Sequence, residues 1–139
     1  MATKIRAEIS QKNKYYIDKH RHYELKHFCL QYPIWKKAYL ECSSTDIPVV
    51  LIDGTRPHDG LYDPESVRAN TRAHYSKRMT LLEKVAKEAD KYLWRYILKA
   101  VTEGLSYTYL KTRLDIPCGK DMYYDRYRRF FWLLSEIRD

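Results

Sequence analysis

The sequence predicts an all-α protein with an N-terminal helical arm, a long central helix and a C-terminal helix-turn-helix. Apolar residues recur at three- and four-residue steps over most of the chain. Asp63-Pro64 is a strong helix-start signal, and Gly104 lies where a periodic segment ends. Residues 47–52 are the one candidate strand, and a lone strand buries nothing, so we interpret this segment as a connector.

The N-terminal region, residues 1–41, is predicted to be basic and helical. The first helix runs from Asn13 to Tyr32, and Pro33 opens a second short helix that continues to Leu40. Nine Lys and Arg stand against four Asp and Glu in this region. Residues 42–62 are punctuated by Ser, Pro and Gly, which predicts a connector loop before a helical domain at 63–139.

The helical domain is predicted to begin with a long helix from Asp63-Pro64 to about Ala89. Its second half carries a seam with alternating steps of four and three, which is typical of ordinary core or of a homodimer interface: Tyr75, Met79, Leu82, Ala86 and Ala89. Asp90 is placed to cap a buried helix at 91–103, which Gly104 ends.

Residues 106–137 carry the predicted helix-turn-helix. Ser106 caps a short helix at 107–114, and the following turn contains Ile116 as its apolar plug. A last helix begins near Lys120. Five of its residues fall within a narrow apolar sector at 100° per residue: Tyr123, Tyr127, Phe130, Leu134 and Ile137.

The opposite side of the last helix is the predicted duplex DNA-binding surface. The start of the helix enters the major groove in this motif, so Lys120, Asp121 and Tyr124 are expected nearest the base edges. Arg128, one turn deeper, is expected to contact guanine or a phosphate. Arg126 and Arg129 are expected on backbone phosphates, and Lys111 and Arg113 beside the turn are expected to hold the flanking strand.

The composition limits the other functions. A formal net charge of +8 favours an anionic partner, either nucleic acid or an anionic membrane surface, although a basic pI also occurs without one. No apolar run is long enough to span a membrane, and no signal peptide is visible. Three scattered cysteines predict reduced thiols in a cytoplasm.

Catalytic and metal-binding patterns are absent from the sequence. There is no CxxC pair, Walker loop, GxSxG or GxGxxG motif, so we predict no enzymatic activity, no cofactor and no metal. His20, His22 and His27 lack an H-x-x-x-H spacing and are interpreted as surface residues. Cys118 lies near a helix start, where a thiolate is favoured, but a small turn residue is the simpler interpretation.

Two stretches resemble a known group of proteins. They are EKVAKEADKYLWRYILKAVTEGLSYTYLKTRLDIPCGKDMYYDRYRRFFWLLS and KNKYYIDKHRHYELKHFCLQYPIWKKAYL. Both resemble small phage and prophage proteins of Gram-positive bacteria of the RinA/ArpU type, which are late-operon transcriptional regulators. The C-terminal helix-turn-helix of that type is similar to region 4 of sigma-70 factors.

The resemblance implies a phage-encoded DNA-binding regulator in the bacterial host cytoplasm, with host RNA polymerase as a further partner. It places the recognition-helix role on Lys120, Asp121, Tyr124 and Arg128. The turn here contains Pro117 and is longer than the usual tight turn, which leaves the contact register open.

Three alternatives accompany this hypothesis. A small terminase-like DNA-packaging protein would use a similar motif inside a ring oligomer of eight or more subunits. A phage antidefence protein would bind a host nucleic-acid enzyme and bind duplex DNA only weakly. In the third alternative, the features are purely structural: the Tyr/Phe stripe belongs to the core and the outer charges are only solvated, as both often are.

Overall fold

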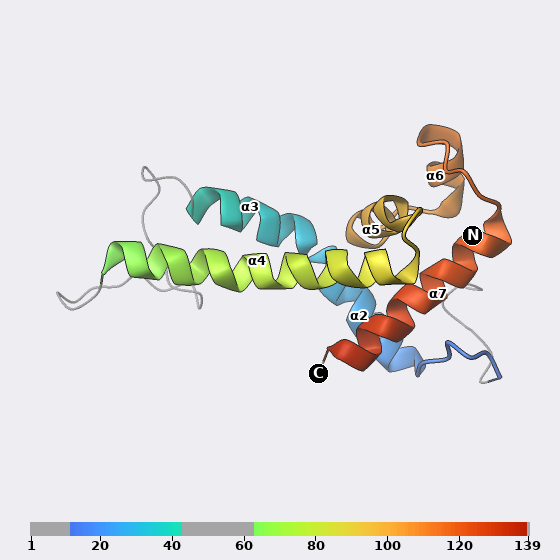
Figure 1. Cartoon of the computed structure of the whole chain (residues 1–139), viewed down its shortest axis with the longest axis horizontal. Coiled ribbons are helices and arrows are strands. Elements are labelled where there is room, and N and C mark those ends of the chain that lie inside the picture. The colour runs from blue at the N-terminus through green and yellow to red at the C-terminus, as the bar shows by residue number, and fades with distance from the viewer. Residues whose placement is uncertain (1–11, 43–62, 139) are drawn as a thin grey trace. The chain divides into compact units, whose positions relative to one another are not determined.

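The computed structural model describes residues 12–42 and 63–138, and these form six α-helices and no strand. The helices are α2 (Lys19–Leu30), α3 (Tyr32–Cys42), α4 (Pro64–Ala89), α5 (Trp94–Glu103), α6 (Tyr107–Arg113) and α7 (Lys120–Ile137) (Figure 1). The predicted all-α class is confirmed for these residues. The predicted strand-like piece at 47–52 and nearly all of the predicted connector lie outside the described residues.

The chain divides into two compact units. One contains Met1–Gln31 and Leu82–Asp139, and the other contains Tyr32–Leu81. This division differs from the predicted regions 1–41, 42–62 and 63–139. Helix α2 belongs with the C-terminal helices because it packs against both α5 and α7. Arg21 on α2 adds polar contacts, since its Nε donates to Ser135 Oγ at 3.2 Å.

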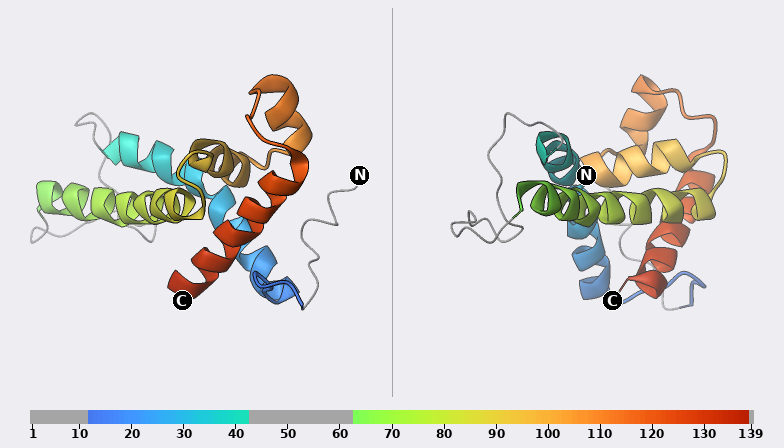
Figure 2. Two further views of the ribbon diagram at one scale, coloured as in Figure 1. Left: turned by 45° about the vertical axis from the view of Figure 1, so that its right-hand side comes forward. Right: turned by 60° about the vertical axis from the view of Figure 1, so that its left-hand side comes forward.

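In the unit Tyr32–Leu81, α3 lies beside the first part of α4 (Figures 1 and 2). Asp63 caps α4 as predicted: its carboxylate accepts from the N–H of Glu65 at 3.1 Å and from Ser66 Oγ at 2.9 Å. Arg72 Nη1 donates to the Cys42 carbonyl at 3.2 Å, which links the end of α3 to α4.

The core of the larger unit draws on all of its helices. Leu82, Ala86 and Ala89 of the predicted seam are buried within it, as expected for core residues. Large side chains from α2, α4, α5, α6, the following turn and α7 are completely buried: Leu25, Leu82, Ile97, Leu110, Ile116, Tyr123, Phe130, Phe131 and Leu134. This continuous core holds the short α6 beside the end of α5 and the start of α7 (Figure 2).

Gly104 ends α5 in the left-handed conformation, with φ 70°, as predicted. The N–H of Leu105 then donates to the Ala100 carbonyl at 3.0 Å. A Cβ at this position would meet only Leu30 Cδ2, at 3.6 Å, which is an ordinary contact distance. A substitution is therefore limited by backbone strain at the positive φ and not by lack of space.

We expect Gly104→Ala to lower the free energy of unfolding by roughly 1 kcal/mol, because alanine resists a positive φ. Urea denaturation followed by circular dichroism measures this change. Gly104→Asn is the control, because asparagine tolerates the left-handed region better than alanine does. Equal losses for the two variants would contradict the conformational explanation.

Candidate nucleic-acid interface

The segment from α6 to the start of α7 follows the predicted order of short helix, turn and long helix. Ser106 Oγ accepts from the N–H of Tyr109 at 3.2 Å and caps α6. Leu110 and Ile116 are completely buried, as predicted for the inner face of α6 and the turn plug. Tyr107 donates its hydroxyl to the Cys118 carbonyl at 2.8 Å, which ties α6 to the far end of the turn.

The turn itself contains a residue in the left-handed backbone conformation. Asp115 has φ 52°, a conformation that aspartate adopts more readily than most residues. After it, the N–H of Ile116 reaches back to the Leu110 carbonyl at 3.1 Å. This backbone path leaves Asp115 and Pro117 exposed and directs Ile116 inward. The turn therefore presents a polar outer surface on an apolar base.

The prediction that Tyr124 faces the groove is wrong. Its side chain is only 8% exposed, and its ring lies 4.9 Å from that of Tyr123 and 5.9 Å from that of Tyr127. The buried sector of α7 is wider than predicted because α7 packs against both α2 and α5. Phe131 is buried for the same reason, with its ring 4.9 Å from that of His22.

At the far end of α7 the departure is reversed: a residue that was predicted to be buried is exposed. Ile137, expected inside, is 44% exposed at the last helical position. On the outer side of α7, the ring of Trp132 lies 5.9 Å from that of Tyr15. The N-terminal segment thus covers part of the outer side of α7, which shortens the stretch of this helix that is open to a partner.

Arg126 is held by the protein rather than placed for a phosphate. Its Nε donates to Asp90 Oδ2 at 2.9 Å, and its Nη1 contacts the carboxylate of Asp125. The other oxygen of Asp90 accepts from the N–H groups of Tyr92 and Leu93, at 2.8 and 2.9 Å. Burial raises the pKa of Asp90, but these N–H donors and Arg126 together lower it below its usual value.

Arg129 also contacts the protein. Its Nη2 donates to the Glu88 carbonyl and its Nη1 to the Tyr15 hydroxyl, both at 3.4 Å. The predicted phosphate role of Arg126 and Arg129 is therefore corrected. Both fasten α7 to the corner between α4 and α5, because the sector of α7 that carries them faces that corner. Arg128 is half-buried, and its Nε has no hydrogen-bond partner within 12–42 and 63–138.

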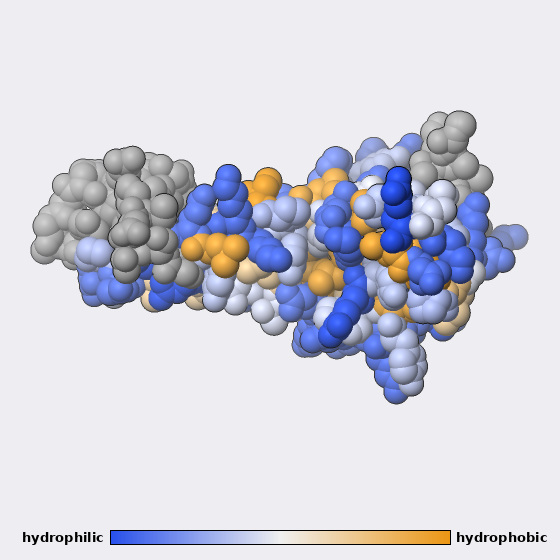
Figure 3. Space-filling view, turned by 90° about the horizontal axis from the view of Figure 1, so that it is seen from above, coloured by the Kyte–Doolittle hydropathy of each residue, from blue (hydrophilic) through white to orange (hydrophobic). Residues whose placement is uncertain are grey.

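Lys111, Arg113, Lys120 and Asp121 are exposed, as predicted. Lys111 Nζ approaches the Ile116 carbonyl at 3.4 Å. None of the four forms an ion pair with another residue in the part of the chain that the structure describes. The described surface seen from above in Figure 3 is mainly hydrophilic, with small separate hydrophobic patches.

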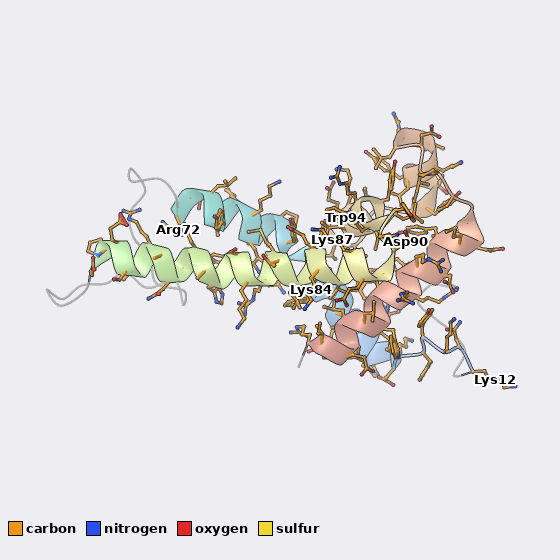
Figure 4. The ribbon with its side chains drawn as sticks, viewed as in Figure 1. Lys12, Arg72, Lys84, Lys87, Asp90 and Trp94 are labelled. Atoms are coloured by element: carbon orange, nitrogen blue, oxygen red, sulfur yellow. The ribbon has the colours of Figure 1, made fainter. Side chains whose placement is uncertain are left out.

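A second basic cluster, which the sequence interpretation missed, lies at the corner between α4 and α5. We call Lys87, Lys91, Tyr92, Trp94 and Arg95 the corner cluster. Lys87 Nζ lies 4.7 Å from the centre of the Trp94 ring, and Arg95 Cζ lies 5.2 Å from it. Lys91 Nζ lies 5.2 Å from the ring of Tyr92, which is 80% exposed. Figure 4 labels Lys84, Lys87, Asp90 and Trp94 here.

The corner cluster combines cations and aromatic faces, which suits phosphates and exposed bases. The Arg126–Asp90 ion pair joins this corner directly to α7. The signal was present in the sequence, since Lys87, Lys91 and Arg95 are spaced four residues apart and Tyr92 and Trp94 stand between them. The sequence interpretation missed the corner cluster because it used this stretch only to place a helix cap at Asp90.

Metal and thiol chemistry finds no support at the described positions. Within residues 12–42 and 63–138, no three His, Cys, Asp or Glu side chains form a cluster that could hold a metal ion. Burial raises the pKa of Cys118, which is the opposite of the shift that the nearby helix start favours. Within the same ranges, no helix is both long enough and apolar enough to cross a membrane.

No protein-family model, curated protein or solved structure matches this chain. The resemblance to RinA/ArpU-type regulators stays a prediction.

Proposed function

We propose that the chain binds duplex DNA through α6, the turn at 114–119 and the first turn of α7, as a phage-type transcriptional regulator. The observation that carries this proposal is the set of exposed cations Lys111, Arg113 and Lys120, which have no carboxylate partner among the described residues. Cations in this state can neutralise phosphates and release condensed counterions.

The charge of the larger unit supports the same proposal. Residues 12–31 and 82–138 contain seventeen Lys and Arg against ten Asp and Glu, a difference of +7. Several of these cations are used internally, as Arg126 is by Asp90. The cations around the turn and in the corner cluster form no ion pair among the described residues, so they are available to a polyanion. We assign Lys111, Arg113 and Lys120 to the groove edges and the corner cluster to flanking phosphates.

The rigid base under the turn supports a reading role for its neighbours. Leu110, Ile116 and Tyr123 are buried beneath the exposed residues, so α6 and the start of α7 move little relative to each other. Asp121 in the first turn of α7 can accept from the amino group of cytosine. Arg128 remains the candidate for guanine or phosphate. Tyr124, Arg126 and Arg129 leave the proposed reading surface.

We expect the triple variant Lys111→Ala, Arg113→Ala, Lys120→Ala to weaken duplex binding by between about tenfold and a hundredfold near 0.1 M salt. The slope of log K against log[salt] should fall by about 2.7, since each phosphate contact contributes about 0.9. Fluorescence anisotropy with a labelled duplex of about 30 base pairs measures both quantities. Circular dichroism checks that the variant is folded.

The matched control is Lys36→Ala, Lys37→Ala, Lys77→Ala, which removes the same charge from exposed positions of the other unit. Equal losses for the two triple variants would show general electrostatic attraction and overturn the proposed surface. Selection of bound fragments from random duplexes at two salt concentrations then tests sequence reading, because only specific contacts keep a consensus at higher salt. Absence of duplex binding at low salt would overturn the function itself.

A further inference from the structure

Tyr92 of the corner cluster is the most exposed large hydrophobic side chain of the described residues, at 80%. Binding of flanking phosphates would use the cations of the cluster and leave this ring in water. A single exposed ring would need no explanation by itself. This ring, however, lies among cations, and Lys91 Nζ is 5.2 Å from its centre. The combination indicates a partner that carries both negative charge and a flat apolar face.

The backbone beneath Tyr92 is fixed although its side chain is exposed. The N–H groups of Tyr92 and Leu93 donate to Asp90 Oδ1 at 2.8 and 2.9 Å, and Leu93 is only 3% exposed. Asp90 Oδ2 in turn accepts from Arg126 Nε of α7 at 2.9 Å. These contacts hold the turn at 91–93 in place before any partner arrives. A ring on an ordered backbone loses less conformational entropy on binding than a ring on a mobile loop.

Trp94 has a different part in the cluster, because it positions two cations. Lys87 Nζ lies 4.7 Å and Arg95 Cζ 5.2 Å from the centre of its half-buried ring, and Figure 4 shows Lys87 and Trp94 near the end of α4. Lys87, Lys91 and Arg95 are exposed, and so is Glu88 beside them. None of these four forms an ion pair with another described residue, so the corner has a net positive charge.

An unpaired nucleotide has the two properties that this corner would recognise. Its phosphate attracts the cations, and the face of its base stacks on an aromatic ring. A base inside a duplex is already stacked on its neighbours and does not offer its face unless it is flipped out. An anionic membrane surface would also attract the cations, but insertion needs a wider apolar face, and Leu93 is turned inward.

We propose that the corner cluster binds single-stranded DNA, with one unpaired base stacked on Tyr92 and the adjacent phosphates held by Lys87, Lys91 and Arg95. This activity goes beyond the binding of duplex DNA through α6 and α7. Only the choice of DNA over RNA rests on the proposed function, because the same unit carries the surface proposed for duplex DNA. The stacking on Tyr92 does not depend on it.

The test compares two strands of equal charge: a thymidine strand of about 12 nucleotides and an abasic strand with the same backbone. Fluorescence anisotropy of the labelled strands near 0.05 M salt measures the affinity of the full chain for each. We expect the thymidine strand to bind about tenfold more tightly, since stacking contributes about 5- to 150-fold per base. Equal affinities, or no binding of the thymidine strand up to about 0.5 mM, overturn the proposal.

Three variants test the assignment to Tyr92. Tyr92→Ala should reduce the preference for the thymidine strand to less than about twofold, whereas Tyr92→Phe keeps the ring and should retain the preference. Tyr109→Ala removes another exposed tyrosine of the same unit, at 42%, and should leave the preference unchanged. The exposure of Tyr92 means that neither substitution there should alter the melting temperature appreciably. A preference that survives in Tyr92→Ala overturns the stacking.

Further arms separate this inference from the proposed function and from other partners. The triple variant of Lys111, Arg113 and Lys120 should lose duplex binding and keep the preference for bases. If the wild type shows that preference and binds no duplex, the proposed function fails and the corner site stands. Tighter binding of a uridine strand of equal length overturns the choice of DNA. If Tyr92→Ala weakens binding to phosphatidylglycerol vesicles and leaves the base preference intact, the proposal is overturned in favour of a membrane contact.

Discussion

Leu110→Ala is expected to lower the free energy of unfolding by about 2–5 kcal/mol, the cost of truncating a completely buried leucine. Leu110 is the buried residue of α6, and α6 has only seven residues. A helix of that length is unstable alone, so it depends on its apolar anchor. Urea unfolding followed at 222 nm measures the change, and duplex binding should weaken in parallel if α6 carries the proposed surface.

The same helix offers a matched control for this experiment. Tyr109 is the neighbour of Leu110 and is 42% exposed, so Tyr109→Ala should change stability by no more than about 0.5 kcal/mol. Leu110→Met keeps most of the volume and should cost less than about 1.5 kcal/mol. If Leu110→Ala costs no more than Tyr109→Ala, α6 does not dock through Leu110.

Acidification is expected to destabilise the protein through His22. This side chain is buried, and its Nε2 has no hydrogen-bond partner within the described ranges. Burial, followed by the charge of Lys26, lowers the pKa of His22 from 6.5 to about 4. The neighbouring rings of Phe131 and Tyr127, at 4.9 and 6.4 Å, provide no counter-charge.

The sign of the effect follows from linkage. Below pH 6.5 the unfolded chain binds a proton at this histidine, while the folded protein stays neutral there until about pH 4. Stability therefore falls as the pH falls through this window, by about 2 kcal/mol at pH 5 and about 3 kcal/mol at pH 4. Above pH 7 the histidine makes no difference, because both states are neutral.

Denaturant unfolding at a series of pH values measures this dependence. His22→Leu, which is similar in size and cannot titrate, should remove most of the loss between pH 7 and pH 5. His20→Gln and His27→Gln change exposed histidines of the same helix and should leave the wild-type slope intact. A slope that survives in His22→Leu would assign the acid sensitivity to other groups.

His22 also shows where the sequence interpretation was limited. The three histidines of α2 look alike in the sequence, and all were interpreted as surface residues. His20 and His27 are exposed, whereas His22 is packed against α7. The helical period alone cannot separate them, because the face of α2 that is buried depends on where α7 lies.

The helix ends, by contrast, were predictable from local sequence. Asp63 and Ser106 accept the capping hydrogen bonds of α4 and α6, and Gly104 adopts a positive φ, as predicted. The predicted cap at Asp90 was wrong in detail: its carboxylate accepts from the N–H groups of a turn, and α5 begins only at Trp94, with Leu93 as its N-cap. Each signal acts over a few residues, so it needs no knowledge of distant parts of the chain. The burial of Ile116 in the turn was likewise predicted from its position between two helices.

The sequence by itself determined the helical class, the caps of α4 and α6 and the order of short helix, turn and long helix, since short-range hydrogen bonds and helical period specify them. Only the tertiary structure decided what α7 presents to solvent. Tyr124 is covered because neighbours on two sides widen the buried sector, and Arg126 is occupied by Asp90, thirty-six residues earlier in the chain. Burial and charge pairing between distant segments depend on packing, which a local pattern does not contain.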